Sequence, residues 1–81
     1  MVTVKVLFFG MSRDLTNSSS VQMDFNKGTS VGLFRELIMV KYPELKEMKN
    51  FAVAVNESYA DEEHVLMDND VLAIIPPVSG G

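Results

Sequence analysis

Cysteine and tryptophan are both absent from this chain of 81 residues. Without cysteine there is no disulfide, no thiolate-ligated metal and no cysteine nucleophile. A single histidine leaves little for metal binding or general-base catalysis, so no metal site is expected. The sequence also lacks an apolar run of about 18 residues and a recognisable secretory leader. We therefore expect a cytoplasmic protein that does not contact a membrane.

Basic residues are scarce as well. Seven Lys and Arg stand against eleven Asp and Glu, which gives a net charge of −4. Nucleic acids and anionic membranes attract clustered positive charge, so neither is an expected partner, whereas a partner with a basic surface is favoured. With 47% apolar and 22% charged residues, the composition is typical of one small globular domain with a modest core. A deep, enclosed active site is not expected in such a domain.

Hydrophobic periodicity predicts several strands and one helix. Alternation of apolar and polar residues, or short runs rich in β-branched residues, predicts strands at residues 3–9, 21–25, 51–55, 65–67 and 71–75. The first two are expected to pair as an antiparallel hairpin, with a single helical turn at residues 11–15 between them. Residues 57–63 are acidic and are expected to be exposed.

The period changes to three or four residues in the middle of the chain, which predicts a helix from residue 31 to about residue 42. Its buried stripe is predicted to consist of Val31, Phe34, Leu37 and Ile38. Thr29 or Ser30 can cap the helix N-terminus, and Pro43 should end the helix at the preceding residue. Arg35 is expected to reach solvent.

Two strands, one crossing helix and further strands form the β-grasp arrangement. One helix must cover one sheet, because no other segment is long enough to make a second packing layer. We therefore expect an α+β protein with the β-grasp (ubiquitin-like) fold, a mixed sheet of four to five strands and one main crossing helix. Residues 1–77 are predicted to form this domain, and residues 78–81 a flexible C-terminal tail.

Two internal motifs have ordinary explanations. Residues 28–32 contain two glycines but no following lysine, so they indicate a turn and a helix start rather than a phosphate-binding loop. Residues 68–70 begin like a calcium loop, but Leu72 occupies the position of the third oxygen ligand, so turn chemistry is favoured. His64 has no partners at a spacing typical of a catalytic triad and is interpreted as a surface residue.

The C-terminus carries the strongest functional signal. Pro76 and Pro77 lack N–H groups and fix φ, so they end strand pairing and stiffen the chain as it leaves the sheet. Gly80 and Gly81 have no Cβ, so they can enter a channel too narrow for other residues. The α-carboxylate of Gly81 is then accessible and chemically convertible.

These residues resemble the MoaD-type family of small, sulfur-carrying subunits of molybdopterin synthase. The resemblance covers nearly the whole chain and is most specific in the closing Pro-Pro-Val-Ser-Gly-Gly; the similar segments are residues 4–9, 13–15, 33–37, 54–57, 64–70 and 76–81. Three positions depart from the family pattern. Asn69 replaces a turn glycine, Val71 replaces an acidic residue, and Ile75 stands where many bacterial members have phenylalanine.

The resemblance implies that an E1-like enzyme adenylates Gly81 and that the acyl adenylate is converted to a thiocarboxylate (1-thioglycine). The tail then enters a basic pocket of the large synthase subunit and donates sulfur to cyclic pyranopterin monophosphate. The tail residues that would enter this pocket are Pro76, Pro77, Val78, Ser79, Gly80 and Gly81. The family also implies a heterotetramer of two small and two large subunits, with no bound cofactor on the small subunit. In this scheme the chain supplies a nucleophile, and the catalytic groups belong to the partner.

The same positional comparison makes Phe9, Tyr59 and Ile75 candidates for an apolar face that binds the partner. Three alternatives remain open: a sulfur carrier for thiazole synthesis or tRNA thiolation, a ubiquitin-like protein modifier that forms isopeptide bonds through Gly81, and an interaction module with an inert tail. Covalent conjugates that depend on Gly81 would indicate the modifier.

Overall fold

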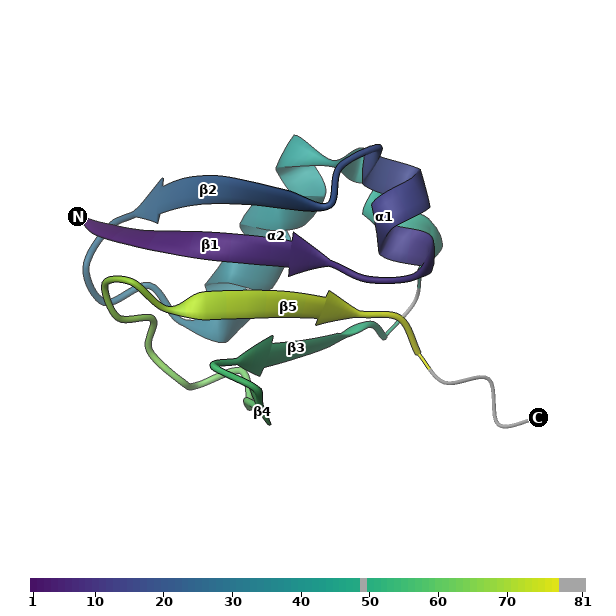
Figure 1. Cartoon of the computed structure of the whole chain (residues 1–81). Helices are drawn as coiled ribbons and strands as arrows, with labels where there is room; N and C mark the ends of the chain where they lie inside the picture. Colours follow the sequence, from purple (N-terminus) through teal and green to yellow (C-terminus); the bar gives the residue numbers. More distant parts are fainter. Residues whose placement is uncertain (49, 78–81) are drawn as a thin grey trace.

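The computed structural model describes residues 1–48 and 50–77, and its main feature is a mixed five-stranded sheet crossed by one helix (Figure 1). The elements in chain order are β1 (Val2–Phe8), α1 (Met11–Thr16), β2 (Ser20–Phe25), α2 (Val31–Lys41), the 3₁₀ helix η1 (Pro43–Glu47), β3 (Ala52–Val55), β4 (Ser58–Tyr59) and β5 (Val71–Ile75). The α+β architecture with the β-grasp arrangement, expected from the sequence, is confirmed.

The sheet has the strand order β2-β1-β5-β3-β4, so the first and last long strands are neighbours in its centre. β1 and β5 run parallel, whereas β1–β2, β3–β5 and β3–β4 are antiparallel pairs. The expected β1–β2 hairpin pairs Val2 with Phe25 at one end and Leu7 with Ser20 at the other. This arrangement brings the end of β5 beside the end of β1 and the start of α1.

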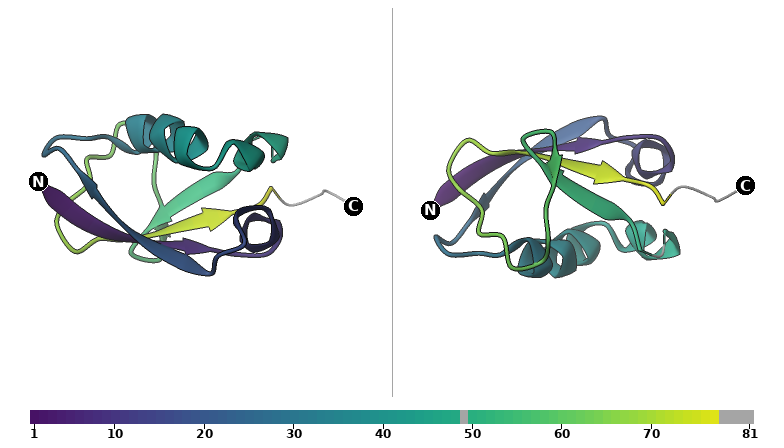
Figure 2. Two further views of the ribbon diagram at one scale, coloured as in Figure 1. Left: turned by 90° about the horizontal axis from the view of Figure 1, so that it is seen from above. Right: turned by 90° about the horizontal axis from the view of Figure 1, so that it is seen from below.

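The core lies between the sheet and α2, which covers one face only (Figure 2). In β1 the inward residues Val4, Val6 and Phe8 are buried, and Lys5 points to the opposite face. Edge-to-face aromatic pairs join the layers: Phe25 of β2 packs on Phe34 of α2, with ring centroids 5.7 Å apart. Such pairs add to the stabilisation from apolar burial. Among the described residues, no helix covers the other face of the sheet.

Local signals set both ends of α2. The Ser30 side chain accepts a hydrogen bond from Leu33 N at 3.1 Å, so the predicted cap is at Ser30. Tyr42, which precedes Pro43, has the non-helical dihedrals φ −127° and ψ 80° and ends the helix as expected. At 11 residues, α2 is the longest helix, and no helix within residues 1–48 and 50–77 combines the length and apolar character needed to cross a membrane.

The predicted buried stripe of α2 is wrong at one position. Val31, Phe34 and Ile38 are fully buried, but Leu37 is 39% exposed. Each residue advances the helix by about 100°, so Leu37 lies beside the stripe, while Met39 packs against the core. Arg35 is also half-buried rather than solvated: its Nη1 donates to Phe51 O at 2.5 Å.

The predicted strand at residues 65–67 is absent. Val65 makes only an isolated bridge with Ser30, and the preceding loop accepts hydrogen bonds from the first turn of α2. Val31 N donates to His64 O at 2.8 Å, and Gly32 N donates to Glu62 O at 2.9 Å. The loop therefore caps the helix. A short strand that was not predicted, β4, forms instead in the acidic segment. That segment was expected to be exposed, and both residues of β4 are exposed.

Candidate functional site

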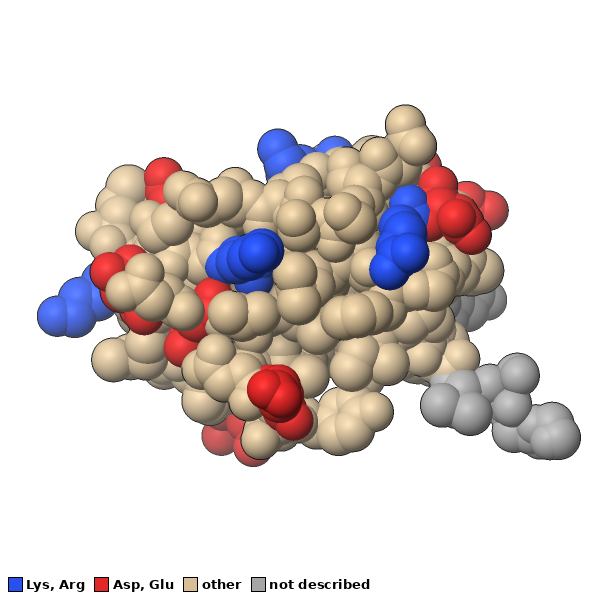
Figure 3. Space-filling view, in the orientation of Figure 1, with Lys and Arg blue, Asp and Glu red and all other residues tan. Residues whose placement is uncertain are grey.

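The face of the sheet opposite α2 carries apolar side chains. Alternation along β5 buries Leu72 and Ile74 beneath α2 and turns Val71, Ala73 and Ile75 outward. The sequence of β5 is thus apolar on both faces, a pattern typical of a strand that is covered on both sides. Figure 3 views this outer face and shows uncharged surface over the C-terminal half of β5, with blue Lys and Arg groups above it in this view and red acidic groups toward the edges.

A hollow of about 300 Å³ lies in this outer face. Its lining residues come from β1, the residue after it, β3, the β3–β4 turn, β4 and β5, and they are Leu7, Phe9, Ala54, Glu57, Tyr59, Val71, Ala73 and Ile75. We call this surface the outer hollow.

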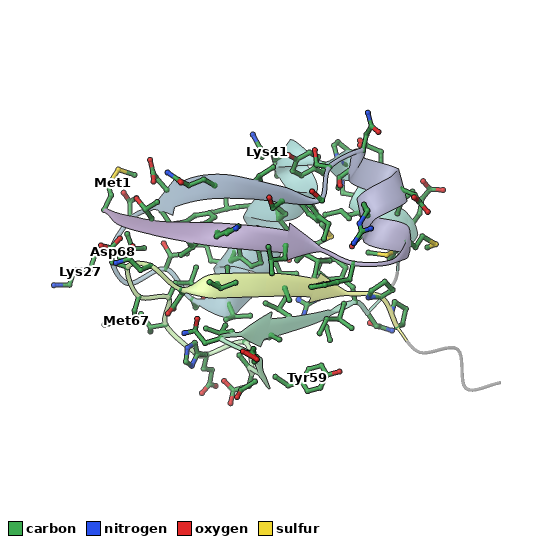
Figure 4. The ribbon with its side chains drawn as sticks, viewed as in Figure 1. Met1, Lys27, Lys41, Tyr59, Met67 and Asp68 are labelled. Carbon is green, nitrogen blue, oxygen red and sulfur yellow. The ribbon has the colours of Figure 1, made fainter. Side chains whose placement is uncertain are left out.

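Strand register explains the shape of the outer hollow. Leu7 pairs with Ala73, Ala73 with Ala54, and Ala54 with Tyr59, which makes one row across four strands. The two alanines in the middle of the row are small, and larger side chains surround them, so the sheet surface dips there. Figure 4 shows Tyr59 projecting from the sheet edge at β4. The hollow has the size and apolar character to receive a side chain of a partner.

The three residues predicted for a partner-binding face lie together in this hollow. Phe9 is 43% exposed, Tyr59 is 74% exposed, and Ile75 is half-buried. Exposed aromatic groups around a concave apolar surface are typical of interaction sites, but the binding role stays a prediction. The remaining lining residues were not predicted from the sequence. The outward apolar positions of β5 were the available signal for Val71 and Ala73.

The chain leaves the sheet next to the outer hollow, since Ile75, the last residue of β5, lines it. β5 ends at Ile75, Pro76 is half-buried and Pro77 is exposed. Ser12, which is fully buried, donates from its Oγ to Phe9 O at 2.6 Å, with Ile74 O as a longer partner at 3.4 Å. These contacts fasten the start of α1 to the end of β5. The remaining predicted tail residues, Val78, Ser79, Gly80 and Gly81, lie outside the described residues.

Gly10 has an unusual backbone conformation and lies close to Pro76, the first residue after β5. It has φ 53° and ψ −129°, and a Cβ at this position would lie 3.3 Å from Pro76 Cγ. L-residues rarely adopt this conformation, so the backbone favours glycine here, and an added Cβ would also require Pro76 to shift by a few tenths of an ångström.

We therefore expect Gly10→Ala to lower the free energy of unfolding by about 1–3 kcal/mol. Gly28→Ala is the matched control, because Gly28 also has positive φ (94°) but has no atom within 4 Å of its added Cβ. Chemical denaturation of both variants would isolate the Pro76 contact. An equal loss in the two variants would show that this contact contributes nothing.

The acidic turn before β5 serves the fold. The buried Asp70 carboxylate accepts hydrogen bonds from Asn56 Nδ2 at 2.9 Å and Met67 N at 2.8 Å, and Asp68 Oδ1 accepts from Thr3 N at 2.8 Å. Asn69 has φ 70°, the left-handed conformation that asparagine tolerates. The turn chemistry predicted for residues 68–70 is confirmed, and these carboxylates are engaged in holding β1, β3 and β5 in register.

A larger hollow, of about 420 Å³, lies on the helix side of the sheet between α2 and η1. Two of its charged lining residues pair with each other: Arg35 Nε lies 3.5 Å from Glu62 Oε1. The Arg35 guanidinium also lies over the Phe51 ring, 4.6 Å from its centroid. These contacts join α2 to the segments on either side of it, so we assign this surface to the fold. The outer hollow, next to the tail exit, is the better functional candidate.

The mixed sheet, the single crossing helix and the C-terminal strand in the sheet centre define a ubiquitin-like β-grasp protein. The chain leaves β5 beside the outer hollow, so the candidate site lies where the last strand of the fold ends. The chain belongs to the ThiS family, whose model matches residues 6–81.

Relatives in sequence span the whole chain. The molybdopterin synthase sulfur carrier subunit of Drosophila yakuba is 38% identical over 84 residues, covering 100% of this chain and 93% of the relative. The protein of the same name from Arabidopsis thaliana is 35% identical over 81 residues, covering 99% of this chain and 84% of the relative.

Solved structures have the same fold. A Pyrococcus furiosus protein assigned as molybdopterin converting factor, subunit 1, has a TM-score of 0.88 at 28% identity, covering 96% of this chain and all of that one. A chain in the complex of subunits 1 and 2 of molybdopterin-converting factor from Helicobacter pylori has a TM-score of 0.71 at 28% identity, with coverage of 99% and 100%. Small archaeal modifier protein 1 from Methanosarcina acetivorans has a TM-score of 0.80 at 26% identity, with coverage of 100% and 98%.

Proposed function

We propose that this protein is the sulfur carrier subunit of a molybdopterin synthase. The observation that carries the proposal is the family match, which continues through the closing Pro-Pro-Val-Ser-Gly-Gly to residue 81, together with relatives of that name over the whole chain. The Gly81 carboxylate is the reactive group. In the cell, we place the protein in the cytoplasm with the enzymes that activate and discharge it.

The proposed chemistry begins at the Gly81 carboxylate. An E1-like enzyme joins a carboxylate oxygen to the α-phosphorus of ATP, and pyrophosphate leaves. A sulfur nucleophile then displaces AMP from the acyl adenylate and leaves Gly81 as a thiocarboxylate. In a pocket of the large subunit this sulfur bonds to a carbon of cyclic pyranopterin monophosphate, and water then cleaves the acyl–sulfur bond, which returns Gly81 to a carboxylate. The chain itself supplies the nucleophile and its delivery.

The outer hollow is the proposed contact with the large subunit, in a heterotetramer of two small and two large subunits. Phe9, Tyr59 and Ile75 surround the floor formed by Ala54 and Ala73, and a partner side chain would fill it. Because Pro76 follows β5 directly at this hollow, docking here would aim the tail into the partner. The net charge of −4 favours encounter with a basic pocket.

Intact-mass measurement tests the proposed chemistry. After co-expression with the cognate E1-like enzyme, the chain should gain about 16 Da, the difference between sulfur and oxygen at the activated end. When the thiocarboxylated carrier is mixed with the large subunit and the pterin precursor, it should lose this added mass and molybdopterin should form. A chain that never gains the mass, or that keeps it in the presence of precursor and large subunit, would contradict the assignment.

Filling the outer hollow tests the proposed contact. Ala73→Tyr should weaken binding to the large subunit about a hundredfold, because the new ring occupies the space meant for the partner. The position faces outward and tyrosine is well accepted in strands, so the fold should persist. Val40→Tyr is the control, since Val40 is exposed on α2, away from this face. Calorimetry would give both affinities. Wild-type affinity for Ala73→Tyr would exclude the hollow as the contact.

A protein modifier is the second candidate, because small archaeal modifier protein 1 shares the fold. This function predicts covalent conjugates on denaturing gels that disappear when Gly81 is deleted. A thiazole or tRNA-thiolation carrier predicts capture of thiazole synthase or a tRNA thiolation enzyme in place of the large subunit. Molybdopterin formation in the reconstituted reaction separates the carrier proposed here from both.

A further inference from the structure

The turn between β3 and β4 has an unusual residue in its second central position. Val55 pairs with Ser58, so Asn56 and Glu57 form a two-residue hairpin loop. Their φ angles are 50° and 73°, and positive φ at both positions is typical of a type I′ turn. Such turns strongly prefer glycine at the second position, where glutamate has an unfavourable backbone conformation.

The rest of the described chain uses residues that tolerate positive φ. Five non-glycine residues have positive φ, and four of them are asparagine: Asn17, Asn50, Asn56 and Asn69. Asparagine visits the left-handed region readily because its short side chain can hydrogen-bond locally. Glu57 is therefore the exception, and its side chain does not offset the strain. Within residues 1–48 and 50–77, no hydrogen bond or ion pair engages its carboxylate.

The location of Glu57 accounts for its presence. Its side chain lines the outer hollow together with Tyr59 and other apolar residues, and among the described residues of that lining it is the one that carries a charge. A backbone strain that contributes nothing to the fold, at the edge of a candidate binding surface, indicates a functional constraint. A carboxylate in such a place becomes partly desolvated when a partner covers the hollow. That desolvation is unfavourable unless the partner supplies a cation.

We propose that Glu57 is a specificity-determining residue of the outer hollow, and that its carboxylate pairs with a lysine or arginine of the bound large subunit. This inference rests on the proposed function, because it names the chemistry of that docking partner. Glu57 then makes the hollow select a partner that combines an apolar side chain with an adjacent cation. Purely apolar surfaces are rejected, because they would leave the carboxylate buried without a partner.

Two substitutions separate the charge from the backbone strain. Glu57→Gln keeps the side-chain length and the strained backbone and removes only the charge. It should weaken binding to the cognate large subunit about tenfold and leave the thermal midpoint unchanged. Glu57→Gly removes both the charge and the strain. It should weaken binding to a similar extent and raise the midpoint of the free chain by about 2–6 °C.

The measurements are calorimetric titration of the large subunit at low and high salt, and thermal unfolding of each free variant. Wild-type binding should weaken as salt rises, and both variants should lose part of that dependence. Unchanged affinity in Glu57→Gln and Glu57→Gly would overturn the inference, and the carboxylate would then only protect a sheet edge. A lower midpoint for Glu57→Gly would overturn the argument from strain.

Ala73→Tyr distinguishes failure of this inference from failure of the proposed docking. If Ala73→Tyr blocks binding and the Glu57 variants bind normally, the hollow is the contact and the ion pair is wrong. If none of the three variants weakens binding, both the docking face and the ion pair are wrong. If only the Glu57 variants weaken binding, the ion pair is supported and the partner contact lies outside the alanine floor.

Discussion

Replacing Gly81 with alanine is expected to abolish sulfur transfer and leave the fold intact. The substitution adds a Cβ next to the reactive carbonyl, in a chain end that is proposed to enter a channel fitted to glycine. The last strand, β5, ends at Ile75, so the circular dichroism and unfolding midpoint of the domain should not change. The measurement is molybdopterin formation from the pterin precursor, with the thiocarboxylated carrier and the large subunit supplied in excess.

A matched pair of extensions sharpens this test. One glycine added after Gly81 displaces the reactive carbonyl by about 3.5 Å and should also inactivate the carrier. One glycine added before Met1, which is exposed at the opposite end of the molecule from the end of β5, should have no effect (Figure 1). Full product formation by Gly81→Ala or by the C-terminal extension would contradict the proposed channel.

Phe34→Ala should produce the largest loss of stability among the substitutions considered. The Phe34 side chain is fully buried in α2 and packs edge-to-face on Phe25, so its removal leaves a cavity between the helix and the sheet. We expect a loss of about 3–5 kcal/mol. A domain of this size has a total stability of about 5–15 kcal/mol, so a large part of it would disappear. Chemical denaturation would measure the change.

Leu37→Ala is the control for the helix register. Periodicity placed Leu37 in the buried stripe, but the structure leaves it 39% exposed. Its truncation should therefore lower the free energy of unfolding by less than about 1 kcal/mol. Equal losses for Phe34→Ala and Leu37→Ala would mean that the helix is rotated relative to the sheet.

The sequence was informative about the fold wherever local signals and packing agree. Alternation located β1, β2 and β5, and Ser30 and Pro43 marked the ends of α2. Prediction from the sequence failed where tertiary contacts, rather than local signals, determine the secondary structure. Residues 65–67 have the composition of a strand, but Val65 makes only an isolated bridge, and the loop before it caps α2 through the carbonyls of Glu62 and His64. Hydrophobic periodicity does not reveal such capping contacts. The two residues of β4 are too few to create a pattern, and they form a strand because β3 offers an edge.

Prediction of the site depended on two different kinds of information. The resemblance to the family picked out Phe9, Tyr59 and Ile75, and the fold brings these three distant positions to one hollow. Ala73 could be recognised only as an outward apolar position of β5, and Ala54 not at all, because an alanine forms the floor of a hollow only when strand register places larger residues around it. Glu57 was also missed, since its significance lies in a φ angle that the sequence does not display.

The central position of β5 has a consequence for biosynthesis. Residues 71–75 are the last to be made among all the strands, yet they join β1 to β3, so without them the sheet falls into two unconnected halves. A nascent chain therefore cannot complete its fold while this segment is still inside the ribosome. Prematurely terminated chains that lack β5 are therefore expected to stay unfolded and open to proteolysis, rather than to compete for the proteins that act on the finished carrier.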